Sequence, residues 1–221
     1  MTVLASPAST MTTVSAAGVL RRGALFAGIL AGPLFVTTAV VQILTRDGFD
    51  LSRHPISLLA NGEYGWVQSA NFIMAGLLSL SFAHGVVPHL RGGRGAIAGP
   101  VLLAVYGVGL ITAGVFKADP AMGFPAGAPA GYPEQISTSS VIHAFAPPLA
   151  FLALVAACLV LARRFAAEGH RTAAAVTVVI ALACFLLPLP FGPLHSVRLF
   201  AAVVLGFAWI TTFAVRLRSR G

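Results

Sequence analysis

Six long apolar segments alternate with shorter polar connections along this chain of 221 residues. They cover residues 24–44, 66–87, 97–116, 141–162, 172–191 and 197–215. A helix of about 20 residues rises about 30 Å, which matches the hydrocarbon core of a bilayer. The pattern predicts an all-α polytopic integral membrane helix bundle with six transmembrane helices. Residues 21–216 would form this domain, preceded by a disordered cytoplasmic tail over 1–20 and followed by a basic cytoplasmic tail over 217–221.

The connections contain local signals for where helices begin. Ser52 is a candidate cap for a short helix starting near Arg53, and Ser139 or Ser140 is a candidate cap for the fourth span. The connection over 118–140 interleaves Pro with Gly, which disfavours regular structure.

Composition supports the membrane assignment. Hydrophobic residues make up 57% of the chain and charged residues only 9%, whereas soluble domains are about one quarter charged. Such a chain cannot cover its surface with polar groups, so the lipid bilayer is the expected surroundings. Cys158 and Cys184 both lie inside apolar segments, where they are expected to pack as small hydrophobic residues.

The net charge of +8 could indicate a nucleic-acid partner, but the positions of the charges explain it differently. Ten of the 14 Lys and Arg residues fall on one side of the predicted topology: Arg21, Arg22, Arg91, Arg94, Arg163, Arg164, Arg171, Arg216, Arg218 and Arg220. The positive-inside rule places that side, and both chain termini, in the cytoplasm. The chain is therefore predicted to be a multi-pass protein of the cell (plasma) membrane that binds no nucleic acid. Its long loops, 45–65 and 117–140, would lie on the outer side.

Polar side chains that could carry chemistry collect on that outer side. His54, Asp119, His143 and His195 come from separate parts of the chain but should share one membrane level. Imidazole and carboxylate groups are suitable ligands for zinc or another divalent metal, which could activate a bound water. Ser57 could then act in catalysis as an oxyanion or water partner. Two alternatives remain open: hydrogen bonds that tie the loops to the helix ends, and a ligand pocket without metal.

Two further residues are candidates for ligand binding. Arg198 stands near the start of the sixth span, where it could contact a ligand, extend toward the interface or pair with an acidic residue. Asn71 lies three residues after Gln68 and so shares a helical face with it. This pair could bond two helices together or line a polar cavity.

Two motifs carry a resemblance to a known family. The first is the run SRHPISLLA over 52–60, which continues to the Gly-Leu-Leu at 76–78. The second is the pattern FKADP over 116–120, with His143 opening the next helix. Together they resemble the bacterial inner-membrane family named domain of unknown function 998. The resemblance covers about 24–215 and implies a six-pass membrane protein without an assigned activity. A more distant similarity is to the multi-pass hydrolases of the alkaline ceramidase and progestin-receptor type, which use Ser, Asp and His around zinc. The chain differs from them in its six predicted spans and in lacking their closing HxxxH.

The sequence therefore supports two functional hypotheses. The first is an integral membrane protein that binds or passes a small molecule or lipid at an outward-facing polar site. The alternative is a metal-dependent membrane hydrolase acting on an amide or ester near the outer leaflet.

Overall fold

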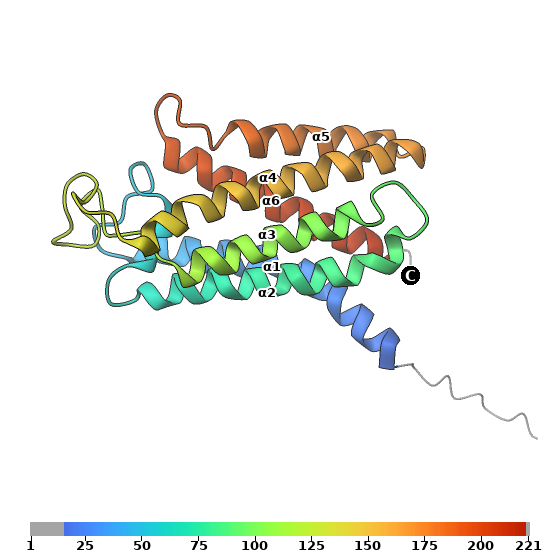
Figure 1. Cartoon of the computed structure of the whole chain (residues 1–221), viewed down its shortest axis with the longest axis horizontal. Coiled ribbons are helices and arrows are strands. Elements are labelled where there is room, and N and C mark those ends of the chain that lie inside the picture. The colour runs from blue at the N-terminus through green and yellow to red at the C-terminus, as the bar shows by residue number, and fades with distance from the viewer. Residues whose placement is uncertain (1–15, 220–221) are drawn as a thin grey trace, which may run out of the picture.

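The computed structural model describes residues 16–219, which form one bundle of six α-helices (Figure 1). The helices are α1 (Ala16–Thr45), α2 (Gly65–Leu90), α3 (Ala98–Val115), α4 (Thr138–Ala167), α5 (Arg171–Leu186) and α6 (His195–Arg218), with a short 3₁₀ helix η1 (Ile56–Ala60) between α1 and α2. The predicted all-α bundle is confirmed. Each helix packs beside its neighbours in sequence, and α6 packs against α1, so the bundle closes into a ring.

The helices have the length and composition of membrane spans. Among the described residues, α1, α2, α3, α4 and α6 are long and apolar enough to cross a bilayer, while α5 is a shorter apolar helix of 16 residues. Large apolar side chains stay exposed on every helix, for example Leu34, Leu77, Val101, Leu152, Val179 and Val215. A bilayer, in which exposed hydrocarbon is stable, accounts for this surface.

The fifth span ends earlier than predicted. The apolar pattern continues to Phe191, but α5 ends at Leu186. Pro188 and Pro190 both lack a backbone N–H and disfavour helical geometry at the residue before them, so this closely spaced pair favours ending the helix here, whereas α1 continues through the single Pro33. The 16 helical residues of α5 rise about 24 Å.

Aromatic side chains join the helices at the centre of the bundle. The ring of Phe35 in α1 lies 5.2 Å from that of Phe72 in α2 and 5.0 Å from that of Phe207 in α6. Tyr106 in α3 contacts Phe207 edge-on, with ring centroids 5.9 Å apart. These contacts hold four helices in register around one apolar core.

Glycine allows α2 and α3 to pack most closely. A Cβ built on Gly76 would lie 2.6 Å from the carbonyl oxygen of Gly107, and one on Gly107 would lie 2.9 Å from that of Gly76. Likewise, a Cβ on Gly109 would lie 2.6 Å from Ala150 Cβ in α4, and one on Gly114 would lie 2.7 Å from the carbonyl oxygen of Ser69. Gly107, Gly109 and Gly114 therefore allow α3 to approach α2 and α4 closely.

Several predicted helix boundaries need correction. The helix α1 begins at Ala16, so residues 16–20 belong to it and not to a disordered tail; residues 1–15 lie outside the described part of the chain. The residues Leu217 and Arg218, assigned to the C-terminal tail, continue α6.

The predicted caps are also displaced. The short helix begins at Ile56 after Pro55, and Ser52 instead donates its backbone N–H to Asp50 Oδ1 over 2.8 Å. The cap of α4 is Ser137, whose hydroxyl accepts the N–H of Ser140. The connection before α4 contains no described helix, as predicted, but backbone hydrogen bonds fold it into a compact turn, including Met122 N–H to the carbonyl of Gly131 at 2.8 Å.

Candidate functional site

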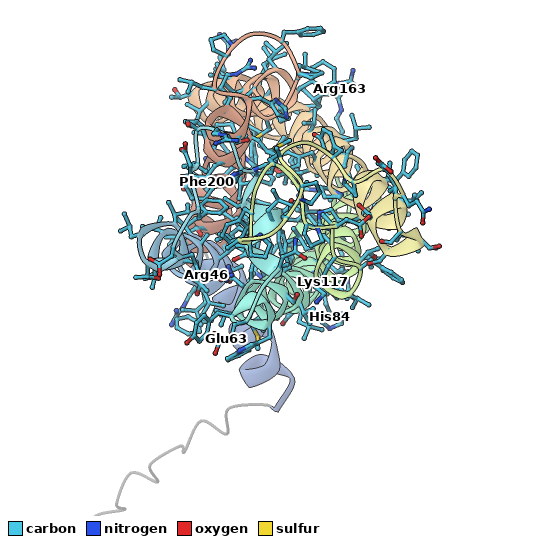
Figure 2. The ribbon with its side chains drawn as sticks, turned by 90° about the vertical axis from the view of Figure 1, so that its left-hand side faces the viewer. Arg46, Glu63, His84, Lys117, Arg163 and Phe200 are labelled. Atoms are coloured by element: carbon cyan, nitrogen blue, oxygen red, sulfur yellow. The ribbon has the colours of Figure 1, made fainter. Side chains whose placement is uncertain are left out.

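Two long connections, 46–64 and 116–137, lie together at one end of the bundle, here named the loop end (Figure 1). Figure 2 looks onto this end, with Arg46 and Glu63 from the first connection and Lys117 from the second. Side chains bond the two connections to each other. Asn61 Nδ2 donates to the carbonyl of Ala118 over 3.1 Å, and Arg53 Nη2 donates to that of Met122 over 3.3 Å.

His54 is the most enclosed residue of this contact. Its Nδ1 accepts the backbone N–H of Asp50 over 2.9 Å, which leaves Nε2 protonated and donating to the carbonyl of Met122 over 3.1 Å. The ring packs against Phe49 and Phe124, with centroids 5.3 and 5.6 Å away, and His54 is only 2% exposed. Both ring nitrogens are occupied, so in this structure His54 holds the loops together and offers no nitrogen to a metal or ligand.

Asp119 joins the end of the α3 segment to the start of α4. Its carboxylate accepts the backbone N–H of Ser137 at 2.8 Å and the Ser137 hydroxyl at 2.6 Å. These hydrogen bonds favour the ionised form and hold the pKa of Asp119 below its usual value. Its own backbone N–H donates to the hydroxyl of Ser140 over 3.2 Å.

A pocket of about 560 Å³, here named the loop-end pocket, opens between these connections and the ends of α4 and α6. Most of its lining is apolar. Six residues from four separate segments carry polar side-chain groups: Ser57, Asp119, Tyr132, Ser140, His143 and His195. Four of the residues predicted for the site therefore share one pocket. Ser140, a predicted cap, also belongs to this lining, and its position three residues before His143 puts both on one face of α4.

His143 is buried in the wall of this pocket, with 6% of its surface exposed. Its Nδ1 lies 2.7 Å from the carbonyl oxygen of Phe116 and 3.1 Å from that of Ala113. Because a carbonyl only accepts, Nδ1 must carry the proton, and Nε2 of the neutral ring carries a lone pair. Among the described residues Nε2 makes no hydrogen bond, so its lone pair can accept one from a pocket occupant.

His195 stands at the first position of α6 and lines the same pocket. Its Nδ1 is buried and lacks a hydrogen-bond partner within residues 16–219. A buried polar atom without a partner costs free energy unless water or a ligand satisfies it. His143 and His195 therefore both present unused hydrogen-bonding capacity.

The other two predicted binding residues lie elsewhere. Asn71 is buried between α1 and α2, where Nδ2 donates to the carbonyl of Phe35 at 3.0 Å and to Gln68 Oε1 at 3.3 Å. Gln42 Nε2 also donates to that Gln68 oxygen, at 2.7 Å, so this cluster bonds two helices together. Arg198 does not line the pocket; its Nη2 lies 3.5 Å from the carbonyl oxygen of Gly192, and its buried Nε has no partner in the described chain.

The geometry bears directly on the metal hypothesis. Within the described residues, no three His, Cys, Asp or Glu side chains lie close enough together to hold one ion. The side chains of Asp119, His143 and His195 share a pocket without forming a coordination shell, and His54 is committed to the loops. Metal binding by these residues therefore stays a prediction.

A small cavity lies deeper in the bundle beside this pocket. It has a volume of about 60 Å³, and Ser57, Pro147 and Leu199 line both spaces. The rest of its wall is apolar and includes the aromatic core residues Phe35, Phe72 and Tyr106. The pocket therefore borders directly on an apolar space inside the bundle, with walls from α1, α2, α3, α4 and α6.

Comparison with known proteins gives one match. The model of a family described as "Protein of unknown function (DUF998)" matches residues 29–216. No curated protein and no solved structure matches the chain.

Proposed function

The chain belongs to the DUF998 family of proteins of unknown function, and we propose that it binds an amphiphilic molecule, a lipid or a small lipid-like compound, in the loop-end pocket. The observation that carries this proposal is the convergence of Ser57, Asp119, His143 and His195 on one largely apolar pocket. Small-molecule sites are concave spaces of about 300–1,000 Å³ with an apolar lining and a few placed polar groups. The loop-end pocket has both features.

The polar lining favours a ligand that donates hydrogen bonds. The carboxylate of Asp119 only accepts, and the lone pair on His143 Nε2 also accepts. No Lys or Arg side chain lines the pocket. A hydroxyl or amine headgroup is therefore a better match than a phosphate or carboxylate.

The apolar lining favours a hydrocarbon chain on the same ligand. Ile136, Phe145 and Leu199 line the pocket, and the bordering cavity inside the bundle adds further apolar wall. Both Phe145 and Leu149 of α4 are exposed on the outer surface of the bundle, which would face lipid. A ligand could thus place its headgroup among the polar side chains and its chain against hydrocarbon.

The charge distribution supports an outward orientation of the pocket in the cell membrane. Many of the described basic residues belong to the opposite end of the bundle: Arg91, Arg94, Arg163, Arg164, Arg171, Arg216 and Arg218. The positive-inside rule assigns that end, with both termini, to the cytoplasm.

Co-purification tests this proposal. The full chain is purified in mild detergent, and bound amphiphiles are extracted and quantified by mass spectrometry. We expect a single hydroxyl- or amine-bearing amphiphile at about one molecule per chain. The His84→Ala control should keep this amount, and His143→Ala should contain at least about tenfold less of it. His84 is an exposed histidine on α2 that does not line the pocket, so the control removes the same side chain elsewhere.

A second variant separates loss of binding from loss of folding. Ala144 is exposed and lines the pocket, so Ala144→Trp fills it without removing a polar group. Depletion of the amphiphile from Ala144→Trp, with unchanged thermal stability, supports the proposal. Identical lipid content in wild type, Ala144→Trp and both histidine variants contradicts it.

Metal-dependent hydrolysis stays a separate hypothesis, favoured by two histidines, one carboxylate and Ser57 lining the same pocket. It requires these groups to move together into a coordination shell. Elemental analysis after purification without chelator tests it: about one zinc or other divalent ion per chain, lost in His143→Ala, would support the hydrolase. Absence of stoichiometric metal after metal is resupplied would remove it.

A further inference from the structure

A second groove lies at the end of the bundle opposite the loop end, between α5 and α6. It has a volume of about 650 Å³. One end of the groove is lined by the first turn of α5 and by Arg216 from the last turns of α6, here called its mouth, and Val176, Ile180 and Leu205 line it further along the two helices. We name it the basic groove. It shares no lining residue with the loop-end pocket.

Positive charge is concentrated at the mouth of the basic groove. Arg171 and Arg216 both line it, and the first turn of α5 contains no acidic residue. Glu168 is the nearest carboxylate in sequence, but it is paired with Arg164 over 2.7 Å. Within residues 16–219 neither Arg171 nor Arg216 forms an ion pair, so both guanidinium groups can neutralise an anion.

The α5 helix adds a second source of positive potential. The N–H of Arg171 already donates to the carbonyl of Gly169 over 3.0 Å, but among the described residues no cap hydrogen bond takes up the N–H groups of Thr172 and Ala173, and both residues line the groove. Uncapped N–H groups at a helix N-terminus, together with the helix dipole, favour a bound phosphate.

The lower part of the groove suits hydrocarbon. Trp209 lines the groove with its indole N–H already donated to Thr177 Oγ1 over 3.1 Å and its ring stacked on Phe213, so it adds an apolar and mostly buried part of the wall. Arg216 is half-buried and lies 5.4 Å from the ring centre of Phe165, which holds its guanidinium beside the groove. A charged mouth above apolar walls, at the level where a span ends, complements a lipid whose phosphate sits above its acyl chains.

From this complementarity we propose that the basic groove binds an anionic phospholipid of the adjoining leaflet. Its phosphate contacts Arg171, Arg216 and the N-terminal amides of α5, and its acyl chains lie along α5 and α6. Basic sites between transmembrane helices on the cytoplasmic side are suited to such headgroups. The lipid would also cover the side of the bundle where the shortest helix, α5, is packed.

Native mass spectrometry of the full chain in detergent tests the proposal, with phosphatidylglycerol and phosphatidylcholine of identical acyl chains as the probes. We expect phosphatidylglycerol to bind at least tenfold more tightly than phosphatidylcholine. Each arginine near an anionic lipid surface contributes about fivefold, so the double variant Arg171→Gln/Arg216→Gln should weaken phosphatidylglycerol binding about 30-fold. Phosphatidylcholine binding should change little.

The matched control removes the same charge from the same end of the bundle. Neither Arg91 nor Arg163 lines the basic groove, so Arg91→Gln/Arg163→Gln should weaken phosphatidylglycerol binding by less than twofold. Ala208 is exposed in the groove, and Ala208→Trp should weaken binding by occupying the acyl-chain position without changing charge.

Three outcomes would overturn the proposal. Equal losses in the two double variants would mean that general surface charge attracts the lipid. Unchanged binding in Ala208→Trp would mean that the groove is not occupied by acyl chains. Competition by glycerol phosphate at concentrations close to those of the lipid would identify a soluble-anion site. His143→Ala should leave phosphatidylglycerol binding unchanged, so this test and the loop-end test can fail independently.

Discussion

Replacing His54 tests whether this histidine holds the two loops together. The side chain makes two hydrogen bonds, to Asp50 N–H and to the carbonyl of Met122, and packs between Phe49 and Phe124. We expect His54→Phe to keep the ring packing and lose both hydrogen bonds. Because a typical hydrogen bond contributes about 1 kcal/mol net, the free energy of unfolding should fall by about 2 kcal/mol.

His54→Ala should cost more, because it also removes a buried ring. Truncation of a large aromatic side chain in a core costs about 3–5 kcal/mol, so we expect a loss in that range for His54→Ala. His84→Ala, on an exposed surface, should change the free energy of unfolding by less than about 0.5 kcal/mol. The order of stability should therefore be wild type and His84→Ala, then His54→Phe, then His54→Ala.

Reversible unfolding in mixed detergent and SDS micelles measures these differences. Hydrogen exchange of the amides in 46–64 and 116–137 should report the same loss locally, because the contact joins these two segments. A His54→Phe protein as stable as wild type, with unchanged exchange in both loops, would refute the structural role. Loss of bound metal from a His54→Phe protein of unchanged stability would instead restore His54 as a ligand.

Three further predictions concern the bundle and the α4 cap. Gln68→Leu should lower the free energy of unfolding by about 1–2 kcal/mol, because it leaves Gln42 without its 2.7 Å partner. In a double-mutant cycle measured by SDS unfolding, changing both Gln42 and Gln68 to Leu should lower it by less than the sum of the two single changes. Gly76→Ala should cost about 1–3 kcal/mol in the same assay, since its Cβ would lie 2.6 Å from a backbone carbonyl of α3, while Gly131→Ala, which meets no atom within 4 Å, should cost little. The folded-state pKa of Asp119 is lowered, so its ionised carboxylate stabilises the α4 cap above the usual Asp pKa of about 4, and this contribution is lost as the pH falls through the lower folded value. Hydrogen exchange at the start of α4 should therefore rise between pH 5 and pH 3 in the wild type, beyond the intrinsic change in exchange rate. Asp119→Asn should lose this pH dependence.

The spans could be predicted from sequence because the bilayer imposes one solution on the backbone. A segment in hydrocarbon must satisfy its N–H and C=O groups internally, so each long apolar run becomes a helix. The ends were less predictable. The apolar pattern continues past Pro188, but the helix does not, and α1 begins at Ala16, before the hydrophobic segment itself begins.

The sequence predicts at which membrane level the candidate site residues lie, but not toward which neighbouring helix or loop their side chains point. Charge and span length place Asp119, His143, His195 and Ser57 at one membrane level, and these four do line one pocket. His54 is at the same level but faces Phe49 and Phe124 in the loops. Topology cannot separate these cases, because the direction of a side chain depends on how the helices are arranged around the ring.

The difference between a structural and a binding histidine in this chain lies in partners that a sequence does not display. His54 is satisfied by a backbone N–H and the carbonyl of Met122, and His143 by the carbonyls of Phe116 and Ala113. Every residue has a carbonyl, so no residue pattern marks these acceptors. The distinction appears only when the ring nitrogens are considered one by one. Both nitrogens of His54 are hydrogen-bonded, whereas among the described residues Nε2 of His143 and Nδ1 of His195 make no hydrogen bond. Of these two nitrogens Nδ1 of His195 is the buried one, and a buried polar atom is costly without a partner, so a hydrogen bond to it from water or a pocket occupant would stabilise the loop end.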